Sequence, residues 1–263
     1  MTKQIAVISD IHSNAIALEI VLKELINRKI TQCIILGDLL TYGTQPNEVI
    51  ELLLNFKNKV ECIFIKGNHE QFYFDIENNI NPIKYKMPKF VEESIFWTND
   101  KLKYNLNESF YWNDNCIINN IYFSHANPFD YGNWTYMNKE EDIFSAAISL
   151  NNKNMNVGIF GHTHRNKNYI ISDNFQKCTV DFANEFKISN DQQLIINTGS
   201  IGQPRGSASG FMIINILDNL LQYDYVSIKL DNKLIRDKMI NTNLSLETQT
   251  KLNSFFLGGG IKL

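Results

Sequence analysis

The sequence predicts an α/β fold, with a largely parallel sheet in the first half of the chain and a β-rich second half. In the first half, short apolar runs rich in β-branched residues alternate with helical patterns. That order implies right-handed crossovers between parallel strands. In the second half, apolar runs follow one another with glycine as punctuation, which indicates successive strands.

Three apolar runs of strand length in the first half each end in polar residues. The runs are Ile5–Ile8, Cys33–Leu36 and Cys62–Ile65, and they lead into Ser9-Asp10, Gly37-Asp38 and Gly67-Asn68-His69. Ligands of open parallel sheets gather at the carboxyl ends of the strands. We therefore expect these polar residues to face a common site.

Helical patterns connect these strands. Residues 14–28 place leucines on one helical stripe, with Ser13 or Asn14 available as the N-cap. Pro46 stands where a first helical turn tolerates proline, ahead of a second apolar stripe that reaches Leu54.

The segment 78–115 interrupts this alternation and is interpreted as a helical insertion over the site, with an amphipathic stretch from Phe90 to Leu102. The later expected elements are strands at Ile121–Phe123, Val157–Phe160, 177–181, 193–198, 210–217 and 222–229, and a helix at Leu246–Leu257. Because no linker divides the chain, residues 1–263 are expected to form one domain.

The composition limits the classes of protein to consider. The chain has 263 residues, 44% hydrophobic and 20% charged, with 25 Lys and Arg against 28 Asp and Glu. This balance excludes a disordered chain and a strongly basic nucleic-acid binder. A phosphate-containing ligand would have to be held by metal ions or a few placed arginines.

Cysteine usage and the N-terminus point to the cytoplasm. The four cysteines stand singly and form no CxxC pair, which is typical of free thiols in a reducing compartment. The first apolar run meets Asp10 too early for a signal peptide, and no apolar stretch is long enough to span a membrane. We expect a soluble cytoplasmic protein.

The placement of the five histidines is the most informative feature. Each follows the end of a predicted strand: His12, His69, His125, His162 and His164. In Asp10-x-His12 and His162-x-His164, residues i and i+2 share one face of an extended segment and can converge on one cation. A single histidine is more often structural, but five at strand ends indicate a metal site.

The donor set is too large for one closed tetrahedral zinc site. Together with Asp10, Asp38 and Asn68, the histidines offer carboxylate, amide and imidazole donors without a thiolate. This mixture suits Mn²⁺, Fe, Zn²⁺ or Mg²⁺, and its number suits two ions about 3.5–4 Å apart that share a carboxylate. We expect two divalent ions, with manganese favoured and iron, zinc, nickel or magnesium as alternatives.

The order Asp10-x-His12, Gly37-Asp38, Gly67-Asn68-His69-Glu70, His125, Gly161-His162-Thr163-His164 resembles the blocks of the calcineurin-like metallophosphoesterase superfamily. The resemblance spans residues 10–164. It implies a four-layer αββα sandwich of two mixed β-sheets flanked by helices. It also implies phosphoester hydrolysis by attack of a metal-bridging hydroxide.

The resemblance assigns roles by position. Its implied first-metal ligands are Asp10, His12 and His164, and its implied second-metal ligands are Asn68, His125 and His162. Asp38 would bridge the two ions. His69 would be the general acid, with Glu70 orienting it.

Two segments bear on the branch of the superfamily. Tyr42 stands where the protein phosphatases of the superfamily have an arginine, which argues against that branch. The segment Asn197–Arg205 looks like the NPGSVGQPR segment of small bacterial phosphodiesterases and their diadenosine-tetraphosphatase relatives, although Thr198 replaces the proline. Arg205 or Arg165 is a candidate for contacting substrate phosphate, and Tyr42 is a second candidate substrate-binding residue.

Several aromatic residues near the motif ends are candidates for stacking a base or aryl group: Tyr42, Phe72, Tyr73, Tyr131 and Trp134. The favoured substrate is a small phosphodiester or nucleotide. A phosphomonoesterase or a dinucleoside-polyphosphate hydrolase is the alternative enzyme. A non-catalytic scaffold of the same fold is the alternative of another class, but scaffold relatives lose ligands or the general acid, and none is missing here. The oligomeric state stays open.

Overall fold

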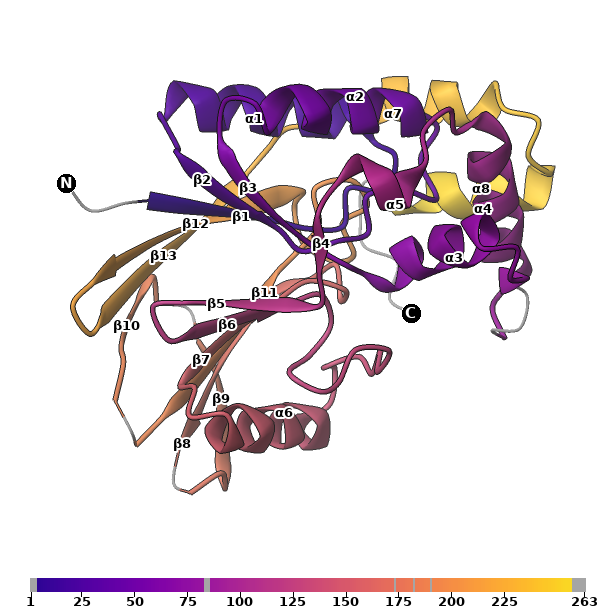
Figure 1. Cartoon of the computed structure of the whole chain (residues 1–263). Helices are drawn as coiled ribbons and strands as arrows, with labels where there is room; N and C mark the ends of the chain where they lie inside the picture. Colours follow the sequence, from indigo (N-terminus) through magenta and orange to yellow (C-terminus); the bar gives the residue numbers. More distant parts are fainter. Residues whose placement is uncertain (1–3, 83–85, 173, 182, 190, 257–263) are drawn as a thin grey trace.

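Two β-sheets pack face to face, and helices cover their outer faces (Figure 1). The computed structural model describes residues 4–82, 86–172, 174–181, 183–189 and 191–256. The four-layer αββα sandwich of two mixed sheets is confirmed.

The first sheet has seven strands in the order β10-β13-β12-β1-β2-β3-β4. Its parallel part consists of β1 (Gln4–Ile8), β2 (Gln32–Ile35), β3 (Glu61–Ile65) and β4 (Trp112–Asn113). Its antiparallel part consists of β12 (Gly210–Leu217), β13 (Leu220–Ser227) and β10 (Glu185–Lys187). The carboxyl ends of β1 to β3 therefore meet at one edge, as the sequence predicts.

The second sheet has six strands in the order β5-β6-β7-β11-β8-β9. Their bounds are β5 Asn115–Ile118, β6 Ile121–Ser124, β7 Val157–Phe160, β8 Asn166–Ser172, β9 Lys177–Asp181 and β11 Gln193–Thr198. The central strands β6, β7 and β11 are parallel, and the outer pairs are antiparallel.

The helices α1 (Ala15–Asn27) and α2 (Pro46–Phe56) lie on the outer face of the first sheet, and α6 (Glu140–Asn152) lies on that of the second (Figure 1). The others gather near the end of the molecule where β1 to β3 finish: α3 (Asn68–Glu77), α4 (Lys89–Lys101), α5 (Leu106–Ser109), α7 (Asn232–Ile240), α8 (Leu246–Asn253) and the 3-10 turn η2 (Ser254–Phe256). None of the helices in the described part of the chain has the length and hydropathy needed to cross a membrane.

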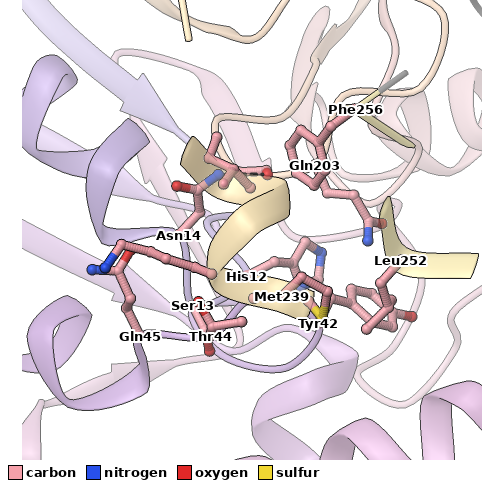
Figure 2. Close-up of a pocket in the computed structure, with 14 residues that line it drawn as sticks. His12, Ser13, Asn14, Tyr42, Thr44, Gln45, Gln203, Met239, Leu252 and Phe256 are labelled. Carbon is pink, nitrogen blue, oxygen red and sulfur yellow. Dashed lines mark hydrogen bonds between the residues drawn. The ribbon is translucent and has the colours of Figure 1, made fainter. Parts of the chain in front are cut away.

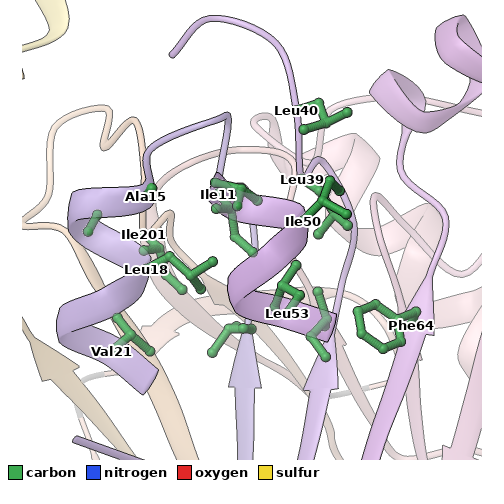
Figure 3. Close-up of a cluster of buried hydrophobic side chains, with 14 of the residues drawn as sticks. Ile11, Ala15, Leu18, Val21, Leu39, Leu40, Ile50, Leu53, Phe64 and Ile201 are labelled. Carbon is green, nitrogen blue, oxygen red and sulfur yellow. The ribbon is translucent and has the colours of Figure 1, made fainter. Parts of the chain in front are cut away.

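Strand alternation divides the apolar side chains among three buried layers. In β1, Val7 faces the layer between the two sheets, whereas Ile8 faces the helices. Figure 3 shows the helix-covered layer, in which Leu18 and Val21 of α1 and Leu53 of α2 pack over the sheet. A third layer lies under α6. The two layers that back the first sheet hold the ends of β1 and β2 in place.

Some elements lack a clear sequence signal. The helix α6 buries a stripe of small and apolar residues that includes Ala146 and Ala147, whose low hydrophobicity weakens the pattern. The strand β8 begins with polar residues. The segment 78–115 contains α4, α5 and β4, and the expected helix at Leu246 ends at Asn253, followed by η2. Leu257, its predicted end, lies outside the described residues.

Candidate metal centre

The loops that follow β1, β2, β3, β6 and β7 bring the predicted metal ligands together. Donor atoms of Asp10, His12, Asp38 and His164 lie within 4.8 Å of one another, and those of Asp38, His125 and His162 form a second such group. Asn68 at the start of α3 places its Oδ1 3.1 Å from His125 Nε2. The two groups share Asp38.

The backbone at these donors is unusual. The φ angles of Asp10, His12, Asp38, His162 and His164 lie between 47° and 61°. Residues other than glycine seldom adopt this left-handed region, and each such residue costs about 1–3 kcal/mol. The tight turns let short loops aim neighbouring side chains at one point.

Glycine is required where loops approach these donors. A Cβ atom on Gly67 would collide with Asp38 Oδ1, and one on Gly161 would collide with Ser9 Oγ. The same Ser9 hydroxyl donates to Asp10 Oδ2 at 2.6 Å. The positions of both carboxylates therefore depend on the absence of a side chain at these glycines.

Each donor imidazole is oriented by a backbone carbonyl on its far side. These contacts join His12 Nδ1 to Leu40 O (3.1 Å), His125 Nδ1 to Leu36 O (2.6 Å), His164 Nδ1 to Gln203 O (2.6 Å) and His162 Nε2 to Trp134 O (3.0 Å). A carbonyl only accepts, so the contacting nitrogen carries the hydrogen. The other nitrogen then presents a lone pair, which is the arrangement of a metal-ligating histidine.

The ring nitrogens on the inner side face one another in pairs. His12 Nε2 lies 3.1 Å from His164 Nε2, and His125 Nε2 lies 3.2 Å from His162 Nδ1. Asp10 Oδ1 is buried without a hydrogen-bond partner among the described residues. Facing ring nitrogens and an unsatisfied carboxylate oxygen are stabilised by a cation, so the donor set fits divalent ions in both groups.

Burial and mutual charge set the protonation states of the metal-free centre. Burial opposes ionisation of Asp38, but the imidazoles of His125 and His69 hold its pKa well below the ordinary value. Burial lowers the pKa of His162 to about 3 and that of His164 to about 4. Burial would also lower the pKa of His125, but the Asp38 carboxylate raises it to about 9.

His69 lies beside the donor groups without belonging to either. Its Nε2 is 3.9 Å from Asp38 Oδ2, and its backbone N–H donates to Asp38 Oδ1 at 2.9 Å. Its Nδ1 lies 2.9 Å from Thr41 Oγ1, which lies 2.7 Å from the Tyr73 hydroxyl. Burial lowers the pKa of His69 to about 3.

Glu70 has a different set of partners from the one expected. Its carboxylate accepts the backbone N–H groups of Gly67 (2.7 Å), Asp38 (2.8 Å) and Leu39 (2.8 Å). Burial and the nearby Asp38 charge raise its pKa to about 7. Thr41, and not Glu70, contacts the His69 ring, while Glu70 ties the Asp38 loop to the start of α3.

The segment Asn197–Arg205 supports the donors from behind. Ser200 Oγ donates to the Asp10 carbonyl at 2.8 Å, and the Gln203 carbonyl holds His164. Figure 2 shows a pocket on this side, where His12, Tyr42 and Gln203 face Met239 of α7 and Leu252 of α8. The C-terminal helices thus close one flank of the centre.

The two predicted substrate-binding residues lie beside this centre. The Tyr42 ring is 8% exposed, and its centroid is 4.7 Å from that of His12 and 4.9 Å from that of His69. The Arg205 guanidinium interacts electrostatically with Tyr42 and His164 and donates to Gln203 Oε1 at 3.0 Å. Its Nε is buried without a partner among the described residues, whereas Arg165 is exposed.

Three of the five aromatic candidates for stacking, Tyr42, Phe72 and Tyr73, are buried, whereas Tyr131 and Trp134 are half-buried. Tyr73 is fully buried, and Tyr131 donates to Gln71 Oε1 while Lys66 Nζ lies 4.3 Å from its ring centroid. Tyr136, which sequence reasoning missed, stacks on the His162 ring and is 42% exposed. Thr41 was missed too. Neither has a distinctive spacing, because both are placed by turns that no periodic pattern encodes.

Comparison with known proteins agrees with this geometry. The family described as calcineurin-like phosphoesterase matches residues 3–166. An uncharacterized protein of Methanocaldococcus jannaschii is 29% identical over 249 residues, which cover 91% of this chain and 93% of that protein.

Two solved structures share the fold. A metallophosphoesterase from Sphaerobacter thermophilus has a TM-score of 0.70 at 19% identity, with 97% of this chain and 100% of that chain covered. A hypothetical protein from Pyrococcus horikoshii has a TM-score of 0.72 at 16% identity, with 98% and 99% covered. Because the family match extends over more than half of the sequence and includes all the clustered donors, this chain belongs to the calcineurin-like phosphoesterase family.

Proposed function

We propose that the protein hydrolyses a small phosphodiester or nucleotide with the help of two divalent metal ions. The observation that carries this proposal is the pair of buried donor groups that share Asp38. A shared carboxylate suits two closely spaced cations, and such pairs serve phosphoryl transfer by holding and polarising the phosphate.

The ligands divide between the two groups. The first ion would be held by Asp10, His12 and His164. The second ion would be held by Asn68, His125 and His162, and the Asp38 carboxylate would bind both ions. When bound, the ions activate water near neutral pH and neutralise charge on the phosphoryl oxygens. Mixed carboxylate, amide and imidazole donors favour manganese over a thiolate-preferring metal, with iron, zinc, nickel and magnesium as alternatives.

His69 is the proposed proton donor to the leaving oxygen, through Nε2. The Thr41 hydroxyl holds the opposite ring nitrogen, which fixes the direction in which Nε2 points. Burial keeps the imidazole neutral in the metal-free protein, and the negative charge of a bound phosphate ester would favour the protonated ring.

Arg205 is the proposed contact for a phosphate oxygen. Its side chain lies next to His164 and Tyr42, and its buried Nε lacks a hydrogen-bond partner among the described residues. A guanidinium can offer two parallel N–H groups to one phosphate, which orients the ester as well as binding it. Tyr42 would line the same side of the bound substrate.

The test compares a diester with a monoester on defined protein. Metal-stripped protein is reconstituted with Mn²⁺ and assayed on bis(p-nitrophenyl) phosphate and p-nitrophenyl phosphate, with Asp38→Asn as the loss variant. Asp100→Asn is the matched control, because the Asp100 side chain is 70% exposed on α4. We expect diester cleavage that Asp38→Asn reduces at least 100-fold and Asp100→Asn leaves unchanged.

The other results separate the alternatives. A preference for the monoester would indicate a phosphomonoesterase in place of the proposed phosphodiesterase. Cleavage of neither substrate by fully metal-loaded protein would favour the non-catalytic scaffold.

A further inference from the structure

A short loop after β6 is held rigidly beside the second donor group. The Asn127 side chain donates to the carbonyls of Asn133 (2.9 Å) and Thr135 (3.1 Å), and His162 Nε2 holds the Trp134 carbonyl between them. Three successive carbonyls are therefore fixed just before Tyr136. Met137, the next residue, is buried in the layer under α6.

This loop presents one exposed aromatic ring to the centre. The rings of Tyr136 and His162 are stacked, with centroids 4.0 Å apart and an interplanar angle of 21°. Even so, Tyr136 is 42% exposed, whereas Tyr42 is 8% exposed and Tyr73 is fully buried. Much of the Tyr136 residue therefore stays in contact with water, and covering it with a planar group would add hydrophobic stabilisation.

The ring also lies within electrostatic reach of Tyr42, one of the proposed substrate contacts. Burial raises the pKa of the Tyr42 phenol, and the nearby Tyr136 phenol adds to that effect. Tyr42 in turn neighbours Arg205 and the His12 ring. Tyr136 and Tyr42 thus border the same donor groups, Tyr136 through the His162 ring and Tyr42 through the His12 ring.

The Tyr136 side chain is not needed to orient His162. The Trp134 carbonyl already fixes Nε2 of that imidazole, and it does so through the backbone. Removal of the phenol should therefore leave the metal ligand in place.

We propose that the exposed ring of Tyr136 is a binding subsite for a planar aromatic group, either a nucleobase or an aryl ring, carried on the phosphate ester. This inference rests on the proposed phosphoesterase function. The ring stands one stacking distance from an imidazole whose free nitrogen faces the donors, so it would meet a group attached close to the phosphorus. Stacking on a fixed ring needs no particular base, so the subsite would select planar groups regardless of which base or aryl ring they are.

The test measures binding without turnover. Phosphonates, whose P–C bond is not hydrolysed, are titrated calorimetrically into Mn²⁺-loaded protein. The first pair is benzylphosphonate and cyclohexylmethylphosphonate, which differ in planarity at similar size. The second pair is the phosphonate analogues of adenosine 5′-monophosphate and ribose 5-phosphate, which differ by the base.

The variants separate stacking from folding and from metal binding. Tyr136→Ala removes the ring, Tyr136→Phe keeps it, and Tyr111→Ala removes a tyrosine that is 86% exposed outside this loop. We expect Tyr136→Ala to weaken binding of the planar members about tenfold, as loss of one stacked base does. Tyr136→Ala should leave the binding of the non-planar ligands and the metal content unchanged. Tyr136→Phe and Tyr111→Ala should bind all the ligands as the wild-type protein does.

The two ligand pairs identify the occupant. Weakening of the benzyl and adenosine ligands alike assigns the subsite to any planar ring, and weakening of the adenosine ligand alone assigns it to a nucleobase. Equal weakening of planar and non-planar members, or no weakening, would overturn the subsite. Failure of the proposed function is seen separately, as absence of diester and monoester cleavage by the wild-type protein.

Discussion

His12 Nε2 and His164 Nε2 lie 3.1 Å apart, although the opposite nitrogen of each ring is already bonded to a backbone carbonyl. The two carbonyls fix the tautomers, so two neutral rings would direct lone pairs at each other. Asp10 Oδ1 lies 3.2 Å from the same His164 nitrogen. The folded chain thus holds three electron-rich atoms together in a buried place, an arrangement that a cation stabilises.

Removal of metal should therefore destabilise the protein. A ligand present at 100 times its Kd stabilises the folded state by about 2.7 kcal/mol, which for a chain of this size corresponds to roughly 5–10 °C in Tm. We expect the chelated protein to melt at least about 5 °C below the Mn²⁺-loaded protein, and His164→Ala to lose most of that difference. The readouts are calorimetric melting and metal content by elemental analysis. An unchanged Tm after addition of Mn²⁺ would show that the donors do not bind metal tightly.

The approach of Gly67 to Asp38 gives a second prediction. A Cβ on Gly67 would collide with Asp38 Oδ1, so Gly67→Ala should displace the carboxylate that both donor groups share. We expect a loss of about 1–3 kcal/mol of stability together with reduced metal content.

Gly132→Ala is the matched control for Gly67→Ala. Gly132 has a φ of +96°, but no atom lies within 4 Å of the place that a Cβ would occupy, so alanine there introduces backbone strain without a clash. It should lower the unfolding free energy by about 1 kcal/mol and leave metal content unchanged. Equal metal content in both variants would contradict the steric argument.

The donors of this centre could be predicted from sequence because their placement depends on a simple rule. Asp10, Asp38, Asn68, His125 and His162 each follow a recognisable apolar run, and parallel strands end at a common edge. The rule needs no knowledge of side-chain contacts. The four-layer fold followed from the resemblance that these same residues carry.

The contacts around the donors could not be predicted in the same way. Thr41 and Tyr42 have φ angles of 73° and 66°, so the chain after Asp38 turns repeatedly through a region that sequence patterns do not identify. These turns decide that Thr41 meets His69 while Glu70 binds backbone N–H groups. The loop that places Tyr136 is likewise fixed by Asn127, whose side chain bonds to residues six and eight positions away.

The metal-free protein should lose stability in acid. Burial lowers the folded-state pKa of His69 and His162 to about 3 and that of His164 to about 4, whereas an unfolded histidine titrates near 6.5. Below pH 6.5 the unfolded state binds more protons, so the free energy of unfolding falls as the pH drops.

We expect at least about 2 kcal/mol of that loss between pH 7 and pH 5, measured by urea denaturation of the chelated protein. His125 and Glu70 act in the opposite direction. Burial opposes but the Asp38 charge raises the folded pKa of His125 to about 9, while burial and the Asp38 charge raise the pKa of Glu70 to about 7. Their contributions are complete below the unfolded values, near 6.5 and 4.5, and are lost as the pH rises through 9 and 7. A metal-free protein more stable at pH 5 than at pH 7 would contradict these directions.

Thr41 and Glu70 should differ in their effect on the reaction because the Thr41 hydroxyl contacts the His69 ring, whereas the Glu70 carboxylate accepts backbone N–H groups. Thr41→Val removes the hydroxyl at Nδ1 without changing the side-chain shape, so the ring loses its orientation and proton donation weakens. We expect kcat on an alkyl ester to fall about tenfold, which is less than the 10²–10⁴-fold rate enhancement that a positioned acid contributes. The kcat on a nitrophenyl ester should change little, because its leaving group needs no proton. Glu70→Gln should instead lower stability by about 1–3 kcal/mol, since it weakens three backbone contacts, and should affect both esters equally. Steady-state rates on the two esters and urea unfolding of both variants distinguish these effects. If the loss of rate depended on the leaving group in Glu70→Gln alone, Glu70 and not Thr41 would orient His69.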